Sequence, residues 1–418
     1  MISDLYTPKQ LGILRRVYND DWFMLILHGA KRSGKTKLNN DLFLQEVLRV
    51  KQKAAEAGVS KPMYILSGAS LGMIDKNILT ELHNSYGLGF NMDKFNNFNL
   101  FGVKIVQVGH SKISGIDNIR GMTAWGAYIN EASLANPEVF DEIKSRCSGE
   151  GARILVDTNT DNPEHWLKKD YIDNDDPMVL EYNFNLYDNV KFLGKRYIDN
   201  MVNTTPSGVF TDRNINGLWV TGVGAVFTDY TKANEVENTL GMQFVRYFAG
   251  VDWGFEHHGI IGVFGITIDG DVVKLKESWA QHKGQEHWLS VAKTYTQVYG
   301  FDIPFYCDSA RPDLISYFRE NGINAKLADK RVMPGIEYMS RVIKSRKLKV
   351  VVSECGLWLK QIYNYRWNKL TGEPIKEDDD SVDMTRYAVF SDFMMMKNMQ
   401  KRNENRKNIK GLVKAYGL

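Results

Sequence analysis

The chain has 418 residues, 43% of them hydrophobic and 25% charged, and its 53 Lys and Arg against 50 Asp and Glu give a net charge of +3. This length exceeds one ordinary core and predicts two domains, while the charge balance means that any basic surface for nucleic acid must be local. Three cysteines without a C-x-x-C spacing argue against a disulfide framework or a zinc site and suit a reducing cytoplasm. We expect no signal peptide and no membrane span, because no run reaches the roughly 18 apolar residues that a span needs.

The first 170 residues alternate short apolar segments with longer helical or loop segments. This alternation is typical of a mostly parallel sheet covered on both faces, so we assign residues 1–170 to an α/β domain. The expected strands are Phe23–Leu27, Met63–Leu66, Lys104–Val108, Trp125–Ile129 and Arg153–Val156.

The segment GAKRSGKT follows the first expected strand, precedes an expected helix and satisfies the pattern G-x-x-x-x-G-K-[ST]. Its glycines let the backbone wrap a phosphate, and the N–H groups at the helix start favour the anion. Lys35 is expected to contact the β- and γ-phosphates of ATP, and the Thr36 hydroxyl to bind Mg²⁺. The other nucleotide-binding candidates in this loop are Gly29, Ala30, Lys31, Arg32, Ser33 and Gly34.

Polar residues follow two later strands of the same domain. Glu131, after the strand in WGAYINEA, is the candidate general base that polarises the attacking water. The usual pattern has Asp where Asn130 stands, and a neutral Asn binds the Mg²⁺ shell more weakly, so we leave the role of Asn130 open. Thr158 and Asn159 are candidates for sensing the γ-phosphate, and an ordinary Asx turn is the alternative.

Residues 171–240 mix polar turns with aromatic residues, and we expect a linker subdomain there. The alternative is that this stretch completes the first domain. We assign residues 241–396 to a second α/β domain built around a β-hairpin that turns at Asp269-Gly270. The expected elements are a strand in RYFAGVDWG, the hairpin, a helix over Gln285–Tyr299, the strand IPFYCD, a helix after Pro312, the strand LKVVV, a helix from about Leu357 and a last helix over Asp383–Met396. The basic tail, 397–418, is expected to be partly disordered, either solvated or in contact with an acidic partner.

Three aspartates of the second domain lie at the edges of expected elements: Asp252, Asp308 and Asp383. Clustered carboxylates without His or Cys suit Mg²⁺ or Mn²⁺, and two such ions can support phosphodiester cleavage. With the hairpin first, the pattern predicts a ribonuclease-H-like nuclease. Asp379 is a further candidate ligand beside Asp380, although this acidic run also fits a solvated helix entry. His257 and His258 receive no catalytic role.

Several ordered segments give the chain a family resemblance. They are LYTPKQ, GAKRSGKT, IRGMTAWGAYINEAS, SRCSGEGARILVDTNTDNPEHWL, GLWVTGVGAVF, AGVDWG, CDSARPDLI and DSVDMTRYA. Together they resemble the large terminase subunit of tailed bacteriophages, a DNA-packaging ATPase. The resemblance implies an N-terminal P-loop ATPase of the ASCE type and a C-terminal ribonuclease-H-like nuclease domain.

The resemblance also implies residue roles. Gln10 is expected to contact adenine, Arg120 to act as an arginine finger in the neighbouring subunit, and the Thr158–Asn159 pair to form the coupling motif. Arg146 and Arg32 are the alternative fingers. The chain departs from the family pattern at Asn130 and at Asp379-Asp380, which stands where the family often has Asp-His.

The implied partners are double-stranded DNA, a portal protein and a small terminase subunit, with five copies of this chain in a ring. The implied location is the cytoplasm of an infected bacterial host, transiently at the procapsid vertex. Two other functions stay open. One is a helicase or repair-type ATPase–nuclease, and the other is a nucleotide-gated DNA-binding protein whose second domain is inactive.

Overall fold

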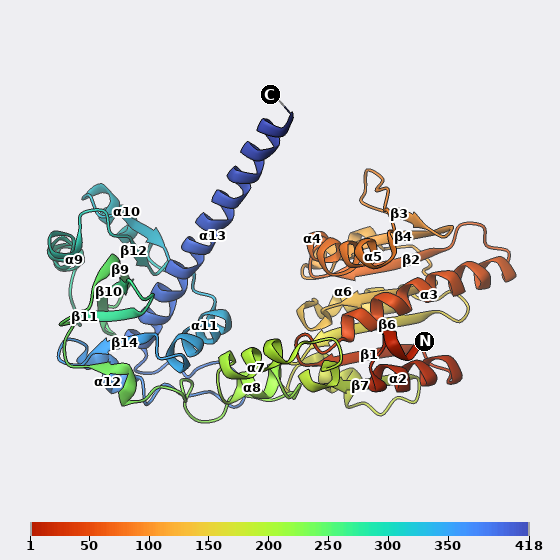
Figure 1. Cartoon of the computed structure of the whole chain (residues 1–418), viewed down its shortest axis with the longest axis horizontal. Helices are drawn as coiled ribbons and strands as arrows, with labels where there is room; N and C mark the ends of the chain where they lie inside the picture. The colour runs from red at the N-terminus through yellow and green to blue at the C-terminus, as the bar shows by residue number, and fades with distance from the viewer. Residues whose placement is uncertain (1, 417–418) are drawn as a thin grey trace. The chain divides into compact units, whose positions relative to one another are not determined.

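The computed structural model describes the backbone of residues 2–416 and the side chains of residues 4–400. The chain divides into two compact units (Figure 1). Unit 1 comprises Met1–Thr205 with Val209–Thr221, and unit 2 comprises Pro206–Gly208 with Gly222–Leu418.

Unit 1 is built on a seven-stranded sheet in the order β3-β4-β2-β5-β6-β1-β7. Its strands are β1 (Met24–Gly29), β2 (Met63–Gly68), β3 (Phe98–Leu100), β4 (Val103–Gly109), β5 (Gly126–Asn130), β6 (Arg153–Asn159) and β7 (Val179–Phe184). Every neighbouring pair is parallel except β3 and β4. The five expected strands and the mostly parallel sheet are confirmed. One strand, β6, lies between β1 and β5, as in the ASCE class.

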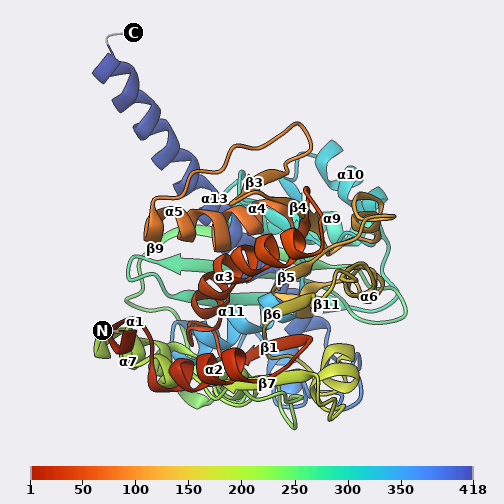
Figure 2. The same ribbon diagram turned by 90° about the vertical axis from the view of Figure 1, so that its right-hand side faces the viewer.

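The central strands of unit 1 are largely apolar because both faces of the sheet are buried there. Leu25 and Leu27 of β1 pack into a core with α2 and α3, while Met24 and Ile26 pack into a second core with α6. Figure 2 shows α3 lying across one face of this sheet. The helices of unit 1 are α1 (Ile2–Leu5), α2 (Pro8–Asn19), α3 (Lys35–Glu56), α4 (Leu71–Ile74), α5 (Thr80–Tyr86), α6 (Pro137–Arg146), α7 (Lys195–Thr204) and α8 (Val209–Asn214).

The stretch 171–240 that the sequence set apart contributes to both units. Strand β7 pairs with β1 at the edge of the first sheet, and α7 and α8 also belong to unit 1. The short strand β8 (Glu235–Val236) pairs with β14 in unit 2. Sequence analysis did not identify β7 because most of its side chains are only partly buried, so it lacks the apolar run of the central strands.

Unit 2 contains a second seven-stranded sheet in the order β13-β12-β9-β10-β11-β14-β8. The further strands are β9 (Phe244–Asp252), β10 (Gly259–Thr267), β11 (Val272–Ala280), β12 (Phe305–Cys307), β13 (Ala325–Leu327) and β14 (Leu348–Val351). Strands β9, β10 and β11 are antiparallel, and β12 joins β9 in parallel. The expected hairpin turn is present, with Gly270 at φ +80°. Three antiparallel strands followed by parallel strands on the β9 side give the ribonuclease-H-like order.

The helices of unit 2 are α9 (Gln285–Tyr299), α10 (Pro312–Glu320), α11 (Val332–Lys344), α12 (Gly356–Gln361) and α13 (Asp380–Tyr416). Helix α13 packs on the sheet where glycines admit it, since a Cβ at Gly250 or Gly262 would lie 2.6 or 2.4 Å from Met384. This helix includes residues 397–416 of the basic tail, whose side chains from 401 onward lie outside the described residues. Within the described chain, no helix combines the length and apolarity that a membrane span requires.

Candidate functional site

The phosphate-binding loop of unit 1 connects β1 to α3. Strand β1 ends at Gly29, and α3 begins at Lys35 with Gly34 as its N-cap. Gly29 has φ +132°, and a Cβ there would lie 2.0 Å from the carbonyl oxygen of Phe184 on β7. Only glycine fits this position, so the loop can turn sharply against the neighbouring strand.

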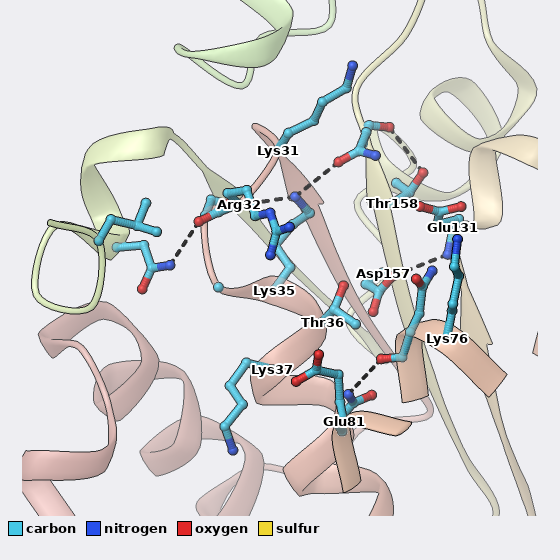
Figure 3. A pocket seen from close by; sticks show the side chains of 17 residues that line it. Lys31, Arg32, Lys35, Thr36, Lys37, Lys76, Glu81, Glu131, Asp157 and Thr158 are labelled. Carbon is cyan, nitrogen blue, oxygen red and sulfur yellow. Dashed lines mark hydrogen bonds between the residues drawn. The ribbon is translucent and has the colours of Figure 1, made fainter. Parts of the chain in front are cut away.

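A cavity of about 650 Å³ opens beside this loop. Its volume lies within the range of roughly 300–1,000 Å³ that is usual for small-molecule sites. Figure 3 shows loop residues facing acidic and basic side chains from other segments across this space. The lining includes Lys31, Arg32, Ser33, Gly34, Lys35, Thr36, Lys37, Asn40, Lys76, Asn77, Glu81, Glu131, Asp157, Thr158, Asn159, Asn189 and Leu193.

Lys35 is buried at the base of the loop. Its Nζ donates to the carbonyl oxygens of Gly29 (3.1 Å) and Ala30 (2.5 Å) and to Ser33 Oγ (3.2 Å). Burial lowers the pKa of Lys35 to about 8, against the opposing charges of Asp157 and Glu131. An anionic phosphate in the loop would therefore stabilise the charged ammonium.

Glu131 lies directly after β5 and faces the same cavity. Its backbone is left-handed, with φ +56°, a conformation that costs free energy for a non-glycine residue and is frequent at functional sites. Burial, followed by the charge of Asp157, raises the pKa of Glu131, while Lys35 and Lys31 oppose the shift. A raised pKa makes a carboxylate a better proton acceptor, as a general base requires.

Asp157 is a site residue that the sequence analysis missed. The expected strand stopped at Val156, whereas β6 runs to Asn159 and carries Asp157 at 1% exposure. Its carboxylate accepts hydrogen bonds from Asn130 Nδ2 (2.7 Å), the Glu131 N–H (3.1 Å) and the Tyr128 hydroxyl (2.7 Å). The available signal was the position of Asp157 at a strand end beside the acidic strand. Lys76 and Glu81, which line the cavity, were also missed; Lys76 lies in the π-helical turn Asp75–Leu79 and Glu81 in α5.

The coupling candidates and the adenine candidate lie against the loop. Asn159 Oδ1 accepts from Lys35 Nζ at 3.4 Å, and Thr158 Oγ1 accepts from the Ser133 N–H at 2.9 Å. Gln10 Nε2 donates to the Gly34 carbonyl oxygen at 2.9 Å, and Gln10 also closes the capping box at the start of α2. Residues far apart in the sequence thus contact the phosphate-binding loop or line the cavity beside it.

The three arginine candidates occupy different surroundings. Arg120 is exposed after the short helical turn Ile113–Asn118, and its side chain forms a 4.0 Å ion pair with Asp117. Arg146 is paired with Glu142 on α6 at 2.6 Å, while Arg32 lines the cavity. Arg32 belongs to the loop of its own unit, whereas Arg120 is exposed enough to face another molecule.

The three predicted aspartates of unit 2 lie at the ends of two neighbouring strands and at a helix start. Asp252 ends β9, Asp308 directly follows the neighbouring β12, and Asp383 lies in the first turn of α13. Burial, followed by the charges of Asp308 and Asp383, raises the pKa of Asp252 well above its usual range. These carboxylates are therefore close enough to interact electrostatically.

Two of these carboxylates already have cationic partners. Asp308 accepts from Lys330 Nζ at 2.6 Å, and Asp383 accepts from buried Arg386 at 2.9 Å. Burial opposes ionisation of Asp383, but Arg386 and the Tyr365 hydroxyl hold its pKa below the ordinary value. Among the described residues, no three His, Cys, Asp or Glu side chains lie in metal-ligating proximity. Oxygen donors suit Mg²⁺ or Mn²⁺, but a metal at Asp308 Oδ1 would compete with Lys330, whose Nζ is bonded to that oxygen.

The residues around these aspartates also have defined partners. Burial, then Asp383, raises the pKa of Asp379 to about 6. Asp380 accepts from Gln361 Nε2 at 3.4 Å and lies 3.3 Å from His258 Nδ1. His257 is exposed. Among the described side chains, neither histidine forms a hydrogen bond or ion pair with Asp252, Asp308 or Asp383.

The two folds and the loop define a class of protein, one chain that joins a P-loop ATPase-type domain to a ribonuclease-H-like domain. Residues 26–229 match the family described as "Terminase large subunit, T4likevirus-type, N-terminal". This match covers just under half of the chain and makes that segment similar to the N-terminal part of a large terminase subunit. No match was found among curated protein sequences.

Solved structures share this fold across nearly the whole chain. The large terminase of a thermophilic bacteriophage aligns with a TM-score of 0.78 and 21% identity, covering 93% of this chain and 99% of that one. The same thermophilic phage protein in complex with ATP-gamma-S aligns with a TM-score of 0.73 and 22% identity, covering 92% and 99%. Its complex with ADP aligns with a TM-score of 0.73 and 21% identity, covering 91% of this chain and 98% of that one. At this identity the likeness supports the fold.

Proposed function

We propose that the chain is a viral DNA-packaging motor that hydrolyses ATP to translocate double-stranded DNA into a procapsid and cuts that DNA with its second unit. The observation that carries this proposal is the cavity of unit 1, where Lys35 of the phosphate-binding loop faces Glu131 across a nucleotide-sized space. The similarity of residues 26–229 to the large terminase family and the ATP-gamma-S complex of the thermophilic phage protein support it.

In the ATPase unit, each residue has an assigned task. The loop residues from Gly29 to Thr36 hold the phosphates, and Gln10 contacts adenine. Mg²⁺ accompanies the nucleotide and supplies charge neutralisation at the phosphates. Glu131 accepts a proton from the attacking water, and its raised pKa suits that task. Thr158 and Asn159 relay the state of the phosphate site, since Asn159 already contacts Lys35.

Arg120 is proposed as the finger that acts on the neighbouring subunit. Its exposure fits a contact in trans, and a guanidinium that approaches the transferring phosphoryl group stabilises its charge. Mixing R120A with E131A protein should restore part of the lost ATPase if Arg120 works across subunits. Absence of restoration at every ratio would favour Arg32, which lines the cavity of its own unit.

In the nuclease unit, Asp252, Asp308 and Asp383 are the proposed cleavage residues, with Asp379 as a further ligand. Mg²⁺ or Mn²⁺ bound there would activate a water and stabilise the leaving oxygen. The proposed partners are double-stranded DNA, a portal protein and a small terminase subunit, with five copies assembled on the procapsid vertex in the host cytoplasm.

The test separates the two activities in the full chain. We expect K35A to abolish ATP turnover while Mn²⁺-dependent plasmid cleavage persists, because the loop and the aspartates belong to different units. D252A and D308A should show the reverse pattern. Cleavage that persists in both aspartate variants would refute the nuclease assignment.

The alternatives make different predictions in the same assays. A helicase or repair-type enzyme would separate the strands of a duplex, whereas a double-strand translocase would not. A nucleotide-gated DNA-binding protein would bind DNA in an ATP-dependent manner without cleaving it under any divalent ion. A wild-type chain that turns over no ATP would refute the motor itself.

A further inference from the structure

The acid missing from β5 has a counterpart on the next strand. Asn130 stands where the family pattern has Asp, and Asp157 is its register partner on the parallel strand β6. Because directly paired residues of neighbouring strands project from the same face, both side chains reach the same side of the sheet. Asn130 Nδ2 donates to Asp157 Oδ1 at 2.7 Å, so the neutral residue supports the carboxylate on the adjacent strand.

Asp157 is costly to bury unless its charge has a use. Its side chain is 1% exposed, and its three hydrogen-bond donors come from neutral groups: the amide of Asn130, the backbone N–H of Glu131 and the hydroxyl of Tyr128. A buried carboxylate whose hydrogen-bond donors are neutral is less favourable than one bonded to a cation. Lys35 acts on Asp157 through charge, but the hydrogen bonds of its Nζ go to other groups. A neutral side chain could join the two strands as well, so these contacts alone do not explain an acid.

The cavity supplies a reason for the charge. Asp157 lines it together with Thr36 and Lys35, and Figure 3 shows the carboxylate and the Thr36 hydroxyl directed into the same part of the space. A carboxylate has about four acceptor positions, and the recorded bonds use three. Carboxylate and hydroxyl oxygens are the ligands that Mg²⁺ prefers. Strand β6 also lies next to β1, which leads into the loop, whereas β5 is one strand further away.

We propose that Asp157 supplies the carboxylate for the Mg²⁺ of the bound nucleotide, together with Thr36, in place of the acid missing at position 130. Asn130 is then a positioning residue: its Nδ2 orients Asp157, and its Oδ1 accepts from Asn77 Nδ2 at 3.0 Å. This inference rests on the proposed ATPase function. The opposing view is that Asp157 only joins β5 to β6 and that Glu131 is the sole acid of the site.

The test measures metal dependence in nucleotide binding, without turnover. The affinity of the full chain for a non-hydrolysable ATP analogue is determined with Mg²⁺ and with a chelator, and Mn²⁺ bound with the analogue is detected by electron paramagnetic resonance. Mg²⁺ should raise the affinity of D157N for the analogue about 10- to 100-fold less than it raises that of the wild type, as for partners of a metal site. The affinity for the analogue measured with the chelator should not change. D157N should also lose the Mn²⁺ signal.

Two further variants control the result. D41N removes another carboxylate of unit 1, which is buried at 4% exposure and does not itself line the cavity. Asp41 is bonded by the hydroxyls of Tyr6 and Tyr86 and by Lys37. D41N should keep the full Mg²⁺ dependence. The exchange N130D/D157N returns the acid to β5 and the amide to β6 while preserving a paired acid and amide, and it should regain most of the dependence.

Each outcome decides between the two views. Unchanged Mg²⁺ dependence and an unchanged Mn²⁺ signal in D157N would overturn the role of Asp157 while leaving the ATPase proposal intact. If D157N does not fold by circular dichroism, the exchange variant decides, and a folded exchange variant without Mg²⁺ dependence overturns the inference. A wild-type chain that binds no nucleotide under any condition refutes the proposed function, and this inference with it.

Discussion

A buried ion pair at the start of α13 allows a quantitative prediction. Lys274 is 0% exposed, and its ammonium donates to Glu277 (2.7 Å), Ser381 (2.6 Å) and Thr385 (3.0 Å). Ser381 and Thr385 flank Asp383 on α13. The network therefore holds the helix start that positions a proposed cleavage residue.

The variant K274M keeps the buried volume but leaves the Glu277 carboxylate without its cation. Removing one partner of a buried pair costs about 3–5 kcal/mol of unfolding free energy. Glu277 retains the Leu357 and Trp358 N–H groups and the Ser381 hydroxyl as donors, so we expect the lower end of that range. The variant K274M/E277Q removes both charges and should recover about 1–3 kcal/mol relative to K274M.

The deficit should also depend on pH. In the wild-type protein burial opposes ionisation of Glu277, but Lys274 and Ser381 hold its pKa below the ordinary value. The stability that this shift contributes is present above the unfolded pKa and is lost as pH falls through the folded pKa. In K274M burial prevails and raises the pKa, so the variant loses stability as pH rises. Its deficit should therefore shrink as pH falls toward about 4, the ordinary pKa of Glu.

Hydrogen exchange read by mass spectrometry suits this chain, because two units need not unfold as one transition. A loss of about 3 kcal/mol corresponds to roughly 100-fold faster exchange, since 1.4 kcal/mol is tenfold. The faster exchange should affect peptides of β11 and α13, while peptides of β1 and α3 in unit 1 keep the wild-type rate. A K274M deficit below about 1 kcal/mol, or a double variant less stable than K274M, would refute the reasoning.

Three further predictions follow from single positions. G29A should lower the unfolding free energy, measured in urea, by more than G58A does. A Cβ at Gly29 would lie 2.0 Å from Phe184, whereas Gly58, at φ +73°, faces open space. Equal losses would mean that the close approach at Gly29 is unimportant. The pKa of Asp379 is raised to about 6 in the folded protein, so protonated Asp379 favours the folded state, and this stability is lost as pH rises from about 4 to 6. D379N should therefore melt at a higher temperature than wild type at pH 7 but not at pH 4. K330M should bind Mn²⁺ more tightly than wild type by calorimetry, because the ion no longer displaces the ammonium from Asp308; weaker binding would contradict this competition.

Sequence analysis could predict the strands that are apolar on both faces and the hairpin whose turn has a characteristic sequence. The runs around Leu25 and Ile129 are apolar on two faces, and the Asp-Gly turn marks the hairpin of unit 2. Helix α11 was missed because Pro334 and Gly335 normally end helices, whereas here the proline lies in the first turn, where it is tolerated. The half-buried strand β7 shows no clear alternation of apolar and polar residues.

The limits at the sites have a different cause. Asp252 and Asp308 could be expected to meet because they end strands, and β9 and β12 are neighbours. The partners of these acids could not be expected, since Lys330 lies in a loop and Arg386 inside a helix. For Asp157 the strand-end position was a signal, but its pairing with Asn130 depends on a strand register that no local pattern records.

Lysines stand opposite the acids at both sites, and this determines how each site can take up its ligand. In unit 1 the ammonium of Lys35 faces Asp157 and Glu131, which oppose the lowering of its pKa. Phosphates bring negative charge to Lys35, and a divalent cation brings positive charge to the acids, so nucleotide and metal together satisfy groups that either one alone would leave unbalanced. In unit 2 the ammonium of Lys330 occupies Asp308 directly, and a metal there must compete with it. Metal binding should therefore be cooperative with nucleotide in unit 1 but competitive with a resident lysine in unit 2. The two sites can consequently respond differently to the same concentration of Mg²⁺.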